Sequence, residues 1–457
     1  MGETVLMRQG LGRKLGVGWT LHGDGSTPAP GEAVAPDERL SWGRTVGLGA
    51  QHVVAMFGAT FVFPVLMGLD PNLAIMVSGV STILFLLIVQ GRIPSYLGSS
   101  ASFVGAVTVI RAGGGDSSAV TGAILVSGVV LAVVGLVVHF VGARVVHRVL
   151  PPAVSGAVVM LIGFNLAPVV AETYWPQDQW IALITMVLVL ACSLLLRGFW
   201  SRIAVFIALV AGYVLSWVFD RVFGMITSPT ASGEVVAHYR VDLSAVPEAS
   251  WFGFPTLHAP SFQATAIVVV LPAVIALIAE NTGHVKAVEE MTRTDLEGSL
   301  GRAIFADGFT TTLSSAVGGP PTTTYAENIG VMAATRVYST AAYWVAAIVA
   351  IGFGLCPKFG AVIAATPGGV LGGITVVLYG MIGLLGAKIW VQNRVDFGNP
   401  VNLLPLAAGL VAGIGDVSLD ITPAFSFSGI ALGTIVTLVG YHVLRVLAPK
   451  GTTGPTV

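Results

Sequence analysis

The chain has few charged residues. Asp, Glu, Lys and Arg make up only 10% of its 457 residues, whereas about 25% is usual for a soluble domain. The formal net charge is −1, so no nucleic-acid partner is expected. The two cysteines, Cys192 and Cys356, lie in apolar stretches, which excludes a disulfide framework and a cysteine-based metal site. No metal or organic cofactor is expected.

Apolar sequence is abundant instead. Hydrophobic residues make up 54% of the chain, and the mean hydropathy is +0.86. Runs such as 75–89 and 123–138 are continuous rather than alternating, which is unlike the strands of a membrane barrel. Helices satisfy their own backbone groups, which lipid cannot do, and about 20 apolar residues cross the hydrocarbon core. We therefore predict an all-α polytopic membrane protein, embedded in a lipid bilayer.

About fourteen windows have the length and hydropathy of a membrane span. They are residues 46–67, 72–90, 96–110, 118–140, 151–170, 179–196, 201–223, 263–284, 299–317, 322–335, 338–356, 367–387, 402–416 and 426–447.

Basic residues orient these spans. With the N-terminus inside, most of the 22 Lys and Arg residues fall in cytoplasmic loops. We therefore expect a multi-pass protein of the cell membrane with both termini in the cytoplasm. Residues 1–45 lack the apolar core of a signal peptide and are expected to form a loose cytoplasmic tail. The longest connection, 224–262, is expected to be external and to hold short structure.

The third and tenth spans differ from ordinary helices. They read Pro94-Ser-Tyr-Leu-Gly-Ser-Ser-Ala-Ser-Phe-Val-Gly105 and Pro320-Pro-Thr-Thr-Thr-Tyr-Ala-Glu-Asn-Ile-Gly330, and each is third in a set of seven. Matching interrupted segments in two halves indicate a transporter binding site. Because each half has an odd number of spans, the second half enters the membrane from the opposite side, and the two halves have opposite orientations. Alternatively, the small residues only permit close helix packing.

Two acids lie in or next to apolar sequence. Glu280 follows the apolar run 264–279, and Glu327 lies within the tenth span. A charge at membrane depth costs roughly 2.5–3.5 kcal/mol on insertion scales and usually marks a substrate or ion path. His284 is one helical turn beyond Glu280, on the same face, and can carry a proton near neutral pH. Two alternatives remain: Glu280 and His284 pair to end a helix at the cytoplasmic surface, and Glu327 caps the helix that follows it.

For the other polar residues in the spans we expect a structural role. Asp307 is expected to link to the helix of Glu280 or to the tenth span through hydrogen bonds. Gln51 and His52 in the first span are expected to belong to a packing or hydrogen-bond network. The spans contain no nucleophile–base pair or metal cluster, so we predict that the chain is not an enzyme.

Four motifs carry a resemblance to a known family. They are Glu327-Asn-Ile-Gly-Val-Met-Ala-Ala-Thr-Arg336, Gln51-His52, Tyr96-Leu-Gly-Ser-Ser100 and Ala279-Glu-Asn-Thr-Gly-His284. With them, residues 40–448 resemble the nucleobase–cation symporter-2 family, also called nucleobase–ascorbate transporters. The details Thr324-Tyr-Ala-Glu-Asn and Ile389-Trp-Val-Gln-Asn-Arg-Val-Asp396 look closest to its bacterial uracil permeases and Rut-type pyrimidine permeases.

The resemblance implies an architecture. It implies fourteen transmembrane segments in a seven-plus-seven inverted repeat, with short antiparallel strands in segments 3 and 10. It also implies a homodimer, in which a core domain moves against a gate domain. The implied divisions are an N-terminal tail (1–45), core (46–140), gate (141–223), external loop (224–262), core (263–356), gate (357–448) and C-terminal tail (449–457).

The resemblance also implies a binding site. Glu280 and Glu327 would accept the ring N–H groups of uracil, and Glu280, His284 and Glu327 would carry the coupling proton. The remaining implied residues are the substrate contacts Ala101, Phe103, Tyr325 and Ala326 and the supporting network of Asp307, Asn328, Gln51 and His52. Ala101 and Ala326 stand where the uracil permease pattern has Phe and Gly.

These features predict a proton-coupled symporter that imports uracil or a related pyrimidine. The alternative is a xanthine or urate symporter of the same family. An anion exchanger of the related sulfate or bicarbonate carriers is disfavoured, because an anion site requires basic residues or bare helix ends rather than two acids.

Overall fold

The computed structural model describes residues 16–26, 28, 32–197, 199–230, 234–422 and 425–449. This part of the chain is mostly helical, as predicted. By length and composition it contains eight helices able to cross a membrane, or nine if one pair bent by 82° forms a single span. Several other predicted spans fold as helices shorter than the roughly 20 residues that a bilayer requires. The architecture is therefore multi-pass, with eight clear spans.

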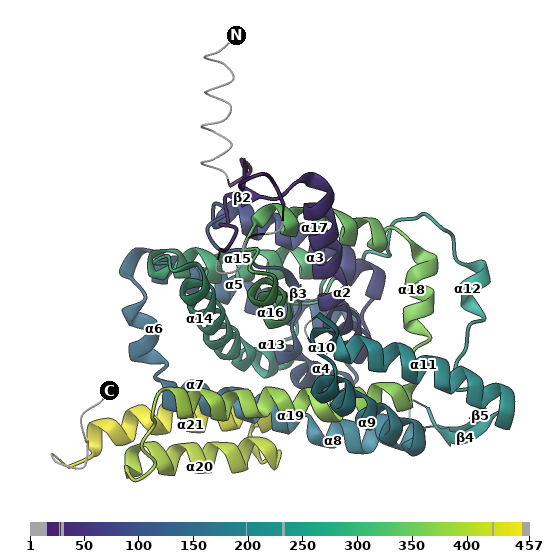
Figure 1. The fold of residues 1–457 in the computed structure, drawn as a ribbon. Helices are drawn as coiled ribbons and strands as arrows, with labels where there is room; N and C mark the ends of the chain where they lie inside the picture. Colours follow the sequence, from purple (N-terminus) through teal and green to yellow (C-terminus); the bar gives the residue numbers. More distant parts are fainter. Residues whose placement is uncertain are drawn as a thin grey trace.

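The helices form two layers (Figure 1). One contains α2 (Trp42–Met67), α3 (Pro71–Ile88), η1 (Ala101–Phe103), α4 (Val104–Ala112), α5 (Ser117–Val141), α13 (Ala264–Val270), α14 (Pro272–Thr292), η4 (Glu297–Ser299), α15 (Leu300–Ala316), α16 (Ala326–Thr335) and α17 (Thr340–Gly354). The other contains α7 (Pro152–Asn165), α8 (Ala167–Val169), η2 (Val170–Tyr174), η3 (Trp175–Gln177), α9 (Gln179–Leu195), α10 (Phe199–Arg202), α11 (Ala204–Phe223), α19 (Gly368–Gln392), α20 (Pro400–Ile414) and α21 (Gly429–Leu447).

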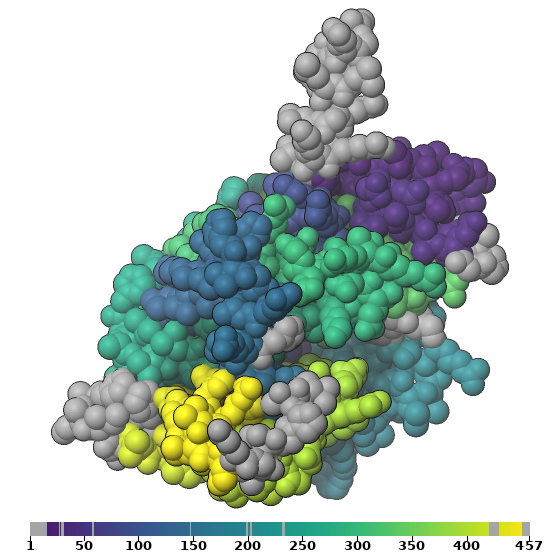
Figure 2. All heavy atoms as spheres, turned by 90° about the vertical axis from the view of Figure 1, so that its left-hand side faces the viewer, coloured from purple at the N-terminus to yellow at the C-terminus, as the bar shows by residue number. Residues whose placement is uncertain are grey.

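Two short helices join the layers. α6 (Arg144–Val149) leads from α5 to α7, and α18 (Pro357–Ala364) leads from α17 to α19. Figure 1 shows them at opposite ends of the molecule. Figure 2 shows the yellow-green and yellow helices of the second layer below the blue and green segments of the first.

Glycine allows the closest contact within the first layer, between α5 and α15. A Cβ at Gly135 would overlap the backbone of Phe305, and a Cβ at Gly308 would overlap the backbone of Ala132. Small residues bring helix backbones together where lipid offers no hydrophobic driving force. The first layer is therefore held by packing that a larger side chain would disrupt.

The interrupted segments form a two-stranded ribbon inside this layer. β3 (Leu97–Ser99) pairs antiparallel with β6 (Thr322–Thr324), with Gly98 opposite Thr323. The amide of Ser100 donates to the carbonyl of Pro321 at 3.0 Å, which extends the pairing at one end. The predicted antiparallel strands of the third and tenth segments are thus confirmed, and their backbone groups pair with each other in place of helical partners.

The eighth predicted span extends further than expected. The helix does not end with the predicted span 263–284, because α14 continues to Thr292. Glu280 therefore lies within the helix, and the alternative that Glu280 and His284 pair at a helix end is wrong. Residues 286–292 are mostly polar but are good helix formers, so the end of the apolar run does not end the helix.

The start of the described chain packs against the first layer. β1 (Thr20–Leu21) and β2 (Glu38–Arg39) pair in parallel, and the Trp19 indole donates to the hydroxyl of Thr340 at 2.8 Å. Val34 and Leu40 are buried against Val337. The expectation of a loose tail is therefore wrong for the described residues between 16 and 41, because apolar side chains hold them. Residues 1–15 and 450–457 of the predicted tails lie outside the described residues.

The long connection 224–262 holds short structure, as predicted. β4 (Ile226–Pro229) and β5 (Val235–His238) form a hairpin, and α12 (Ala245–Glu248) follows. A second hairpin pairs β7 (Ser418–Thr422) with β8 (Phe425–Ser428). Because β8 takes the first residues of the last predicted span, α21 begins at Gly429.

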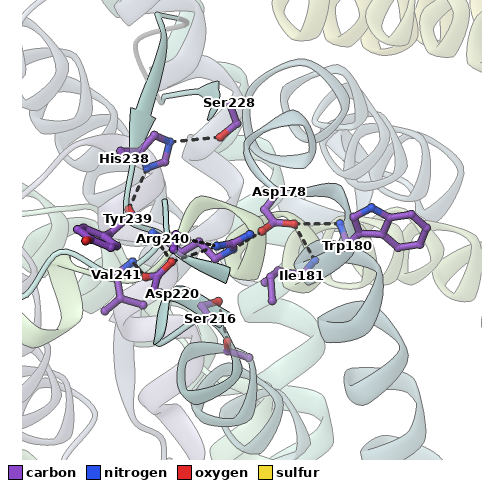
Figure 3. Close-up of polar contacts among 12 residues, drawn as sticks. Asp178, Trp180, Ile181, Ser216, Asp220, Ser228, His238, Tyr239, Arg240 and Val241 are labelled. Carbon is purple, nitrogen blue, oxygen red and sulfur yellow. Dashed lines mark hydrogen bonds and ion pairs between the residues drawn. The ribbon is translucent and has the colours of Figure 1, made fainter. Parts of the chain in front are cut away.

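Arg240 joins the long connection to the second layer (Figure 3). Its Nε lies 2.7 Å from Oδ2 of Asp178, and its Nη1 lies 3.1 Å from Oδ1 of Asp220. Asp178 also accepts the amides of Trp180 and Ile181 at the start of α9. The ion pairs therefore tie the connection to the start of α9 and the end of α11.

Candidate functional site

Tyr325 connects the ribbon to the helix that carries Glu327. Its amide donates to the carbonyl of Tyr96 at 3.0 Å, and its phenol donates to the carbonyl of Ser99 at 2.9 Å. The Tyr325 ring lies over Gly98, where a Cβ would overlap it. The hydroxyl of Thr60 on α2 donates to the phenol oxygen at 3.4 Å. Tyr325 thus fixes the start of α16 relative to β3.

Three acids from three helices meet beside this ribbon. Glu280 on α14 interacts electrostatically with Asp307 on α15 and with Glu327 in the first turn of α16. Thr323 of β6 lies next to the carboxyl groups of Glu280 and Asp307. Residues far apart in the sequence are therefore gathered around the point where both segments are interrupted.

The two glutamates differ in accessibility. The side chain of Glu280 is partly accessible and that of Glu327 is exposed, although α2, α10 and α14 pack around α16. On α16, Ala326, Ala333 and Ala334 are also exposed, whereas the opposite face is buried. An acid on a lipid-facing surface would be costly, so we do not expect this exposed face of α16 to contact lipid.

Asp307 is tied to the helix of Glu280, as the sequence predicted. Nδ2 of Asn281 donates to Oδ2 of Asp307 at 2.5 Å and to the carbonyl of Leu277 at 3.0 Å. Asn281 and Asp307 are both fully buried. The bond therefore joins α14 to α15 directly behind Glu280.

His284 contacts the ribbon and not Glu280. Its Nδ1 lies 2.7 Å from the hydroxyl of Thr324, the residue that ends β6. Ala326, two residues after Thr324, begins α16. A change at His284 can thus be transmitted to the start of that helix through a single hydrogen bond.

The polar residues of the first span form a separate network. Nδ2 of Asn328 donates to the carbonyl of His52 at 2.9 Å and lies 3.2 Å from the His52 Nδ1. The His52 ring packs against Tyr343, with ring centres 4.3 Å apart. Gln51 is partly buried, and its Oε1 has no hydrogen-bond partner among the described residues, so its membership of this network stays a prediction. This network fixes α16 against α2 and α17.

The other predicted contacts differ in accessibility. η1 places Ala101 and Phe103 against α14. Phe103 is fully buried in the core, whereas Ala101 is partly accessible and Ala326 is exposed. Glu327 is not the cap of α16: Tyr325 occupies that position, and Glu327 lies in the first turn, where the helix dipole favours a carboxylate.

Sequence reasoning did not single out Asn281, Thr323 or Thr324. Asn281 follows Glu280 directly, which turns it about 100° around the helix, toward Asp307. The need of a buried acid for a donor could have suggested it. The threonines have no comparable signal, because their role depends on strand register. Within the residues that the structure describes, no group of three His, Cys, Asp or Glu could hold a metal ion.

Many apolar helices, two matched segments in which a strand interrupts the helix, and acids gathered beside those strands are typical of a membrane transporter. Residues 43–422 match the protein family described as the Permease family. Together with the relatives below, this match shows that the chain belongs to the nucleobase–cation symporter-2 permeases and is a transporter, not an enzyme.

The relatives span almost the whole chain. The putative pyrimidine permease RutG of Escherichia coli (strain K12) is 44% identical over 416 residues, which cover 90% of this chain and 91% of that protein. The uracil permease of Bacillus caldolyticus is 36% identical, covering 87% of this chain and 91% of that one. The uracil permease of Escherichia coli (strain K12) is 34% identical, covering 92% and 96%.

Solved structures of distant sequence share the fold. The transmembrane domain of the cyanobacterial bicarbonate transporter BicA matches with a TM-score of 0.56 and 15% identity, covering 87% of this chain and 96% of that one. The murine anion transporter Slc26a9 in the inward-facing state matches with a TM-score of 0.62 and 12% identity, covering 88% and 68%. At these identities the comparison concerns the fold alone.

Proposed function

We propose that this permease imports uracil, or a closely related pyrimidine, together with protons across the cytoplasmic membrane. The observation that carries the proposal is the convergence of Glu280 and Glu327 beside Thr323 of the ribbon and the start of α16. Transport of nucleobases follows from the family, and the relatives named for uracil and pyrimidines support the narrower substrate.

The chemistry of the site suits a neutral planar ring. Uracil has two N–H donors and two carbonyl acceptors in one plane. Glu280 and Glu327 supply carboxylate acceptors, and the first amides of η1 and α16 supply donors, because the first turn of a helix leaves N–H groups free. In this proposal Ala101, Phe103, Tyr325 and Ala326 border the ring. The two acids also argue against an anion as substrate, despite the shared fold with anion carriers.

The coupling proton moves through the same residues. Glu280 and Glu327 interact as like charges, so a proton on one of them reduces their repulsion. His284 lies one turn from Glu280 and bonds to Thr324, so it connects proton binding to the ribbon. A loaded site without net charge crosses the barrier at lower cost than a charged one.

Helix contacts support a seven-plus-seven inverted repeat of fourteen segments. Under such a repeat each segment of the first half corresponds to the segment seven places later: the first to the eighth, the second to the ninth, and finally the seventh to the fourteenth. The pair α5–α15 then corresponds to α17–α3, and the pair α9–α11 to α20–α21; all four pairs are in contact. The contacts α7–α19 and β3–β6 each join two segments that correspond to one another, so the repeat exchanges the two partners and leaves the contact unchanged.

The two layers then have separate roles. The first layer, from segments 46–140 and 263–356, is the core that carries the substrate, and the second, from 141–223 and 357–448, is the gate. Helices α6 and α18 connect them at opposite ends, which suits a core that slides past a gate in an elevator motion. In this proposal the gates of two protomers form a homodimer, and both termini face the cytoplasm.

A purine is the alternative substrate. Ala101 is smaller than the Phe that the uracil permease pattern has at this place, which favours a larger ring. Uptake of labelled uracil, with uracil, thymine, xanthine and urate as competitors, separates the two substrates. Competition by uracil and thymine alone supports the pyrimidine proposal, whereas stronger competition by xanthine or urate would replace it.

A matched pair of variants tests the ligand role. Glu327→Gln removes a charged acceptor, which is worth about 1.5–3 kcal/mol, or about 10–150-fold in affinity. Glu248→Gln on α12 removes an exposed acid far along the chain from the site and should leave affinity unchanged. Equal uracil affinity of both variants would exclude Glu327 from the site.

A further inference from the structure

An exposed aromatic segment follows α12 in the long connection. Trp251 is 76% exposed, Phe252 71%, Phe254 78% and Phe262 62%. Residues 249–263 contain no Asp, Glu, Lys or Arg. Exposed apolar groups this large usually mark an interaction surface rather than an ordinary loop.

The segment is nevertheless held in place by backbone hydrogen bonds. The amide of Gly253 donates to the carbonyl of Leu355 at 3.1 Å, and the amide of His258 donates to Val317 at 3.3 Å. The amide of Ser261 donates to the carbonyl of Ser118 at 2.8 Å. The outward aromatic rings are therefore carried by an ordered strip.

These attachment points set the depth of the strip in the membrane. Leu355 directly follows α17, Val317 directly follows α15, and Ser118 lies at the start of α5. Three helices of the first layer thus end or begin at the level of this strip. Since α5 is long and apolar enough to cross the bilayer, its end lies near the boundary between hydrocarbon and water.

A basic residue completes the surface. The Lys358 ammonium lies 5.2 Å from the centre of the Trp251 ring, and the Lys358 amide donates to the carbonyl of Ser250 at 3.0 Å. Aromatic rings are enriched at the headgroup level of membranes, and a neighbouring cation complements lipid phosphate. The exposed rings, the depth and the charge all fit one partner, the lipid surface.

We propose that residues 251–262 form a membrane-interface anchor, with the aromatic rings among the lipid headgroups and Lys358 facing their phosphates. The anchor fixes the depth of the helix ends of α5, α15 and α17. It does not depend on which substrate the permease carries.

Single-cysteine labelling in lipid nanodiscs tests the anchor. In a Cys192→Ser, Cys356→Ser background, Trp251→Cys and Phe254→Cys are each labelled with a fluorophore. The matched control in the same connection is Val235→Cys on β5, because Val235 is 62% exposed. The quenchers are aqueous iodide and a phosphatidylcholine with a nitroxide near its headgroup.

The labels at 251 and 254 should be quenched by the nitroxide lipid and protected from iodide. The label at 235 should be quenched by iodide and not by the nitroxide lipid. Iodide quenching at 251 and 254 equal to that at 235, without nitroxide quenching, would place the strip in water and overturn the proposal. Protection from both quenchers would mean that protein covers the strip, for example a second copy of the chain, and would also overturn it.

Discussion

Replacing Arg240 with methionine should destabilise the protein without weakening substrate binding. Arg240 is 11% exposed, and Asp178 and Asp220 are each 7% exposed. Removing one partner of a buried ion pair costs about 3–5 kcal/mol, because it leaves an uncompensated charge. Here the loss would leave two such carboxylates at the ends of α9 and α11.

The lower end of that range is expected. Asp178 keeps its bonds from the amides of Trp180 and Ile181, and Asp220 keeps its bond from the amide of Val241. We therefore predict a loss of about 3 kcal/mol, or about a hundredfold in the unfolding equilibrium. Arg240→Lys should lose less, since it keeps the charge but not the forked geometry.

Denaturant unfolding of the purified protein, followed by tryptophan fluorescence, measures this loss. The control is Arg221→Met, which removes an exposed arginine that follows Asp220 on α11 and should change stability by at most about 1 kcal/mol, because it loses only an exposed cation–π contact with Trp217. Because the ion pairs are buried, the difference between the variants should persist at high salt. Equal stability of Arg240→Met and Arg221→Met would refute the reasoning, and so would a loss that vanishes in salt.

Three further predictions concern the ribbon, proton coupling and the N-terminal strands. Tyr325→Phe removes the bond to the buried carbonyl of Ser99 and should cost about 1–3 kcal/mol of stability in the same unfolding assay; unchanged stability would show that the bond is unimportant. Glu280→Gln should abolish the pH dependence of uracil uptake, measured with and without sodium, and uptake that keeps its full pH profile would remove Glu280 from the proton path. Partial burial raises the pKa of Glu38, but bonds from the Ala35 amide and the His22 ring outweigh it and hold that pKa below its ordinary value. Its contribution to stability is therefore present at neutral pH and is lost as the pH falls through the lowered pKa. Glu38→Gln should accordingly speed amide hydrogen exchange in residues 16–41 at pH 7 but not at pH values below that pKa; equal acceleration at both would contradict this.

Local composition predicts that the third and tenth segments are interrupted, because the Gly-, Ser- and Thr-rich sequences around Gly98 and Thr323 cannot form good helices. Their pairing as antiparallel strands is an expectation of the family resemblance alone. An acid within an apolar span likewise predicts that Asp307 bonds to the helix of Glu280 or to the tenth span, because a buried acid needs a donor, but it does not identify Asn281 as that donor. These features depend on rules that act over a few residues.

Other features depend on tertiary contacts. The strands near Trp19 depend on distant partners, since Val34 and Leu40 are buried against Val337 and the Trp19 indole bonds to Thr340. α14 extends past its apolar run because polar residues beyond Lys286 still form a helix outside the hydrocarbon. The phenol of Tyr325 reaches Ser99 only in the observed register of β3 and β6. None of these partners can be identified from spacing along the chain.

The most direct test of the substrate site compares uracil with 1,3-dimethyluracil, which has the same ring and carbonyls but no ring N–H. Calorimetry on the purified protein should give clear binding of uracil and none of the dimethyl compound, because carboxylate acceptors at Glu280 and Glu327 would be left unpaired. Binding of both compounds with similar affinity would contradict the claim that these two acids recognise the ring N–H groups.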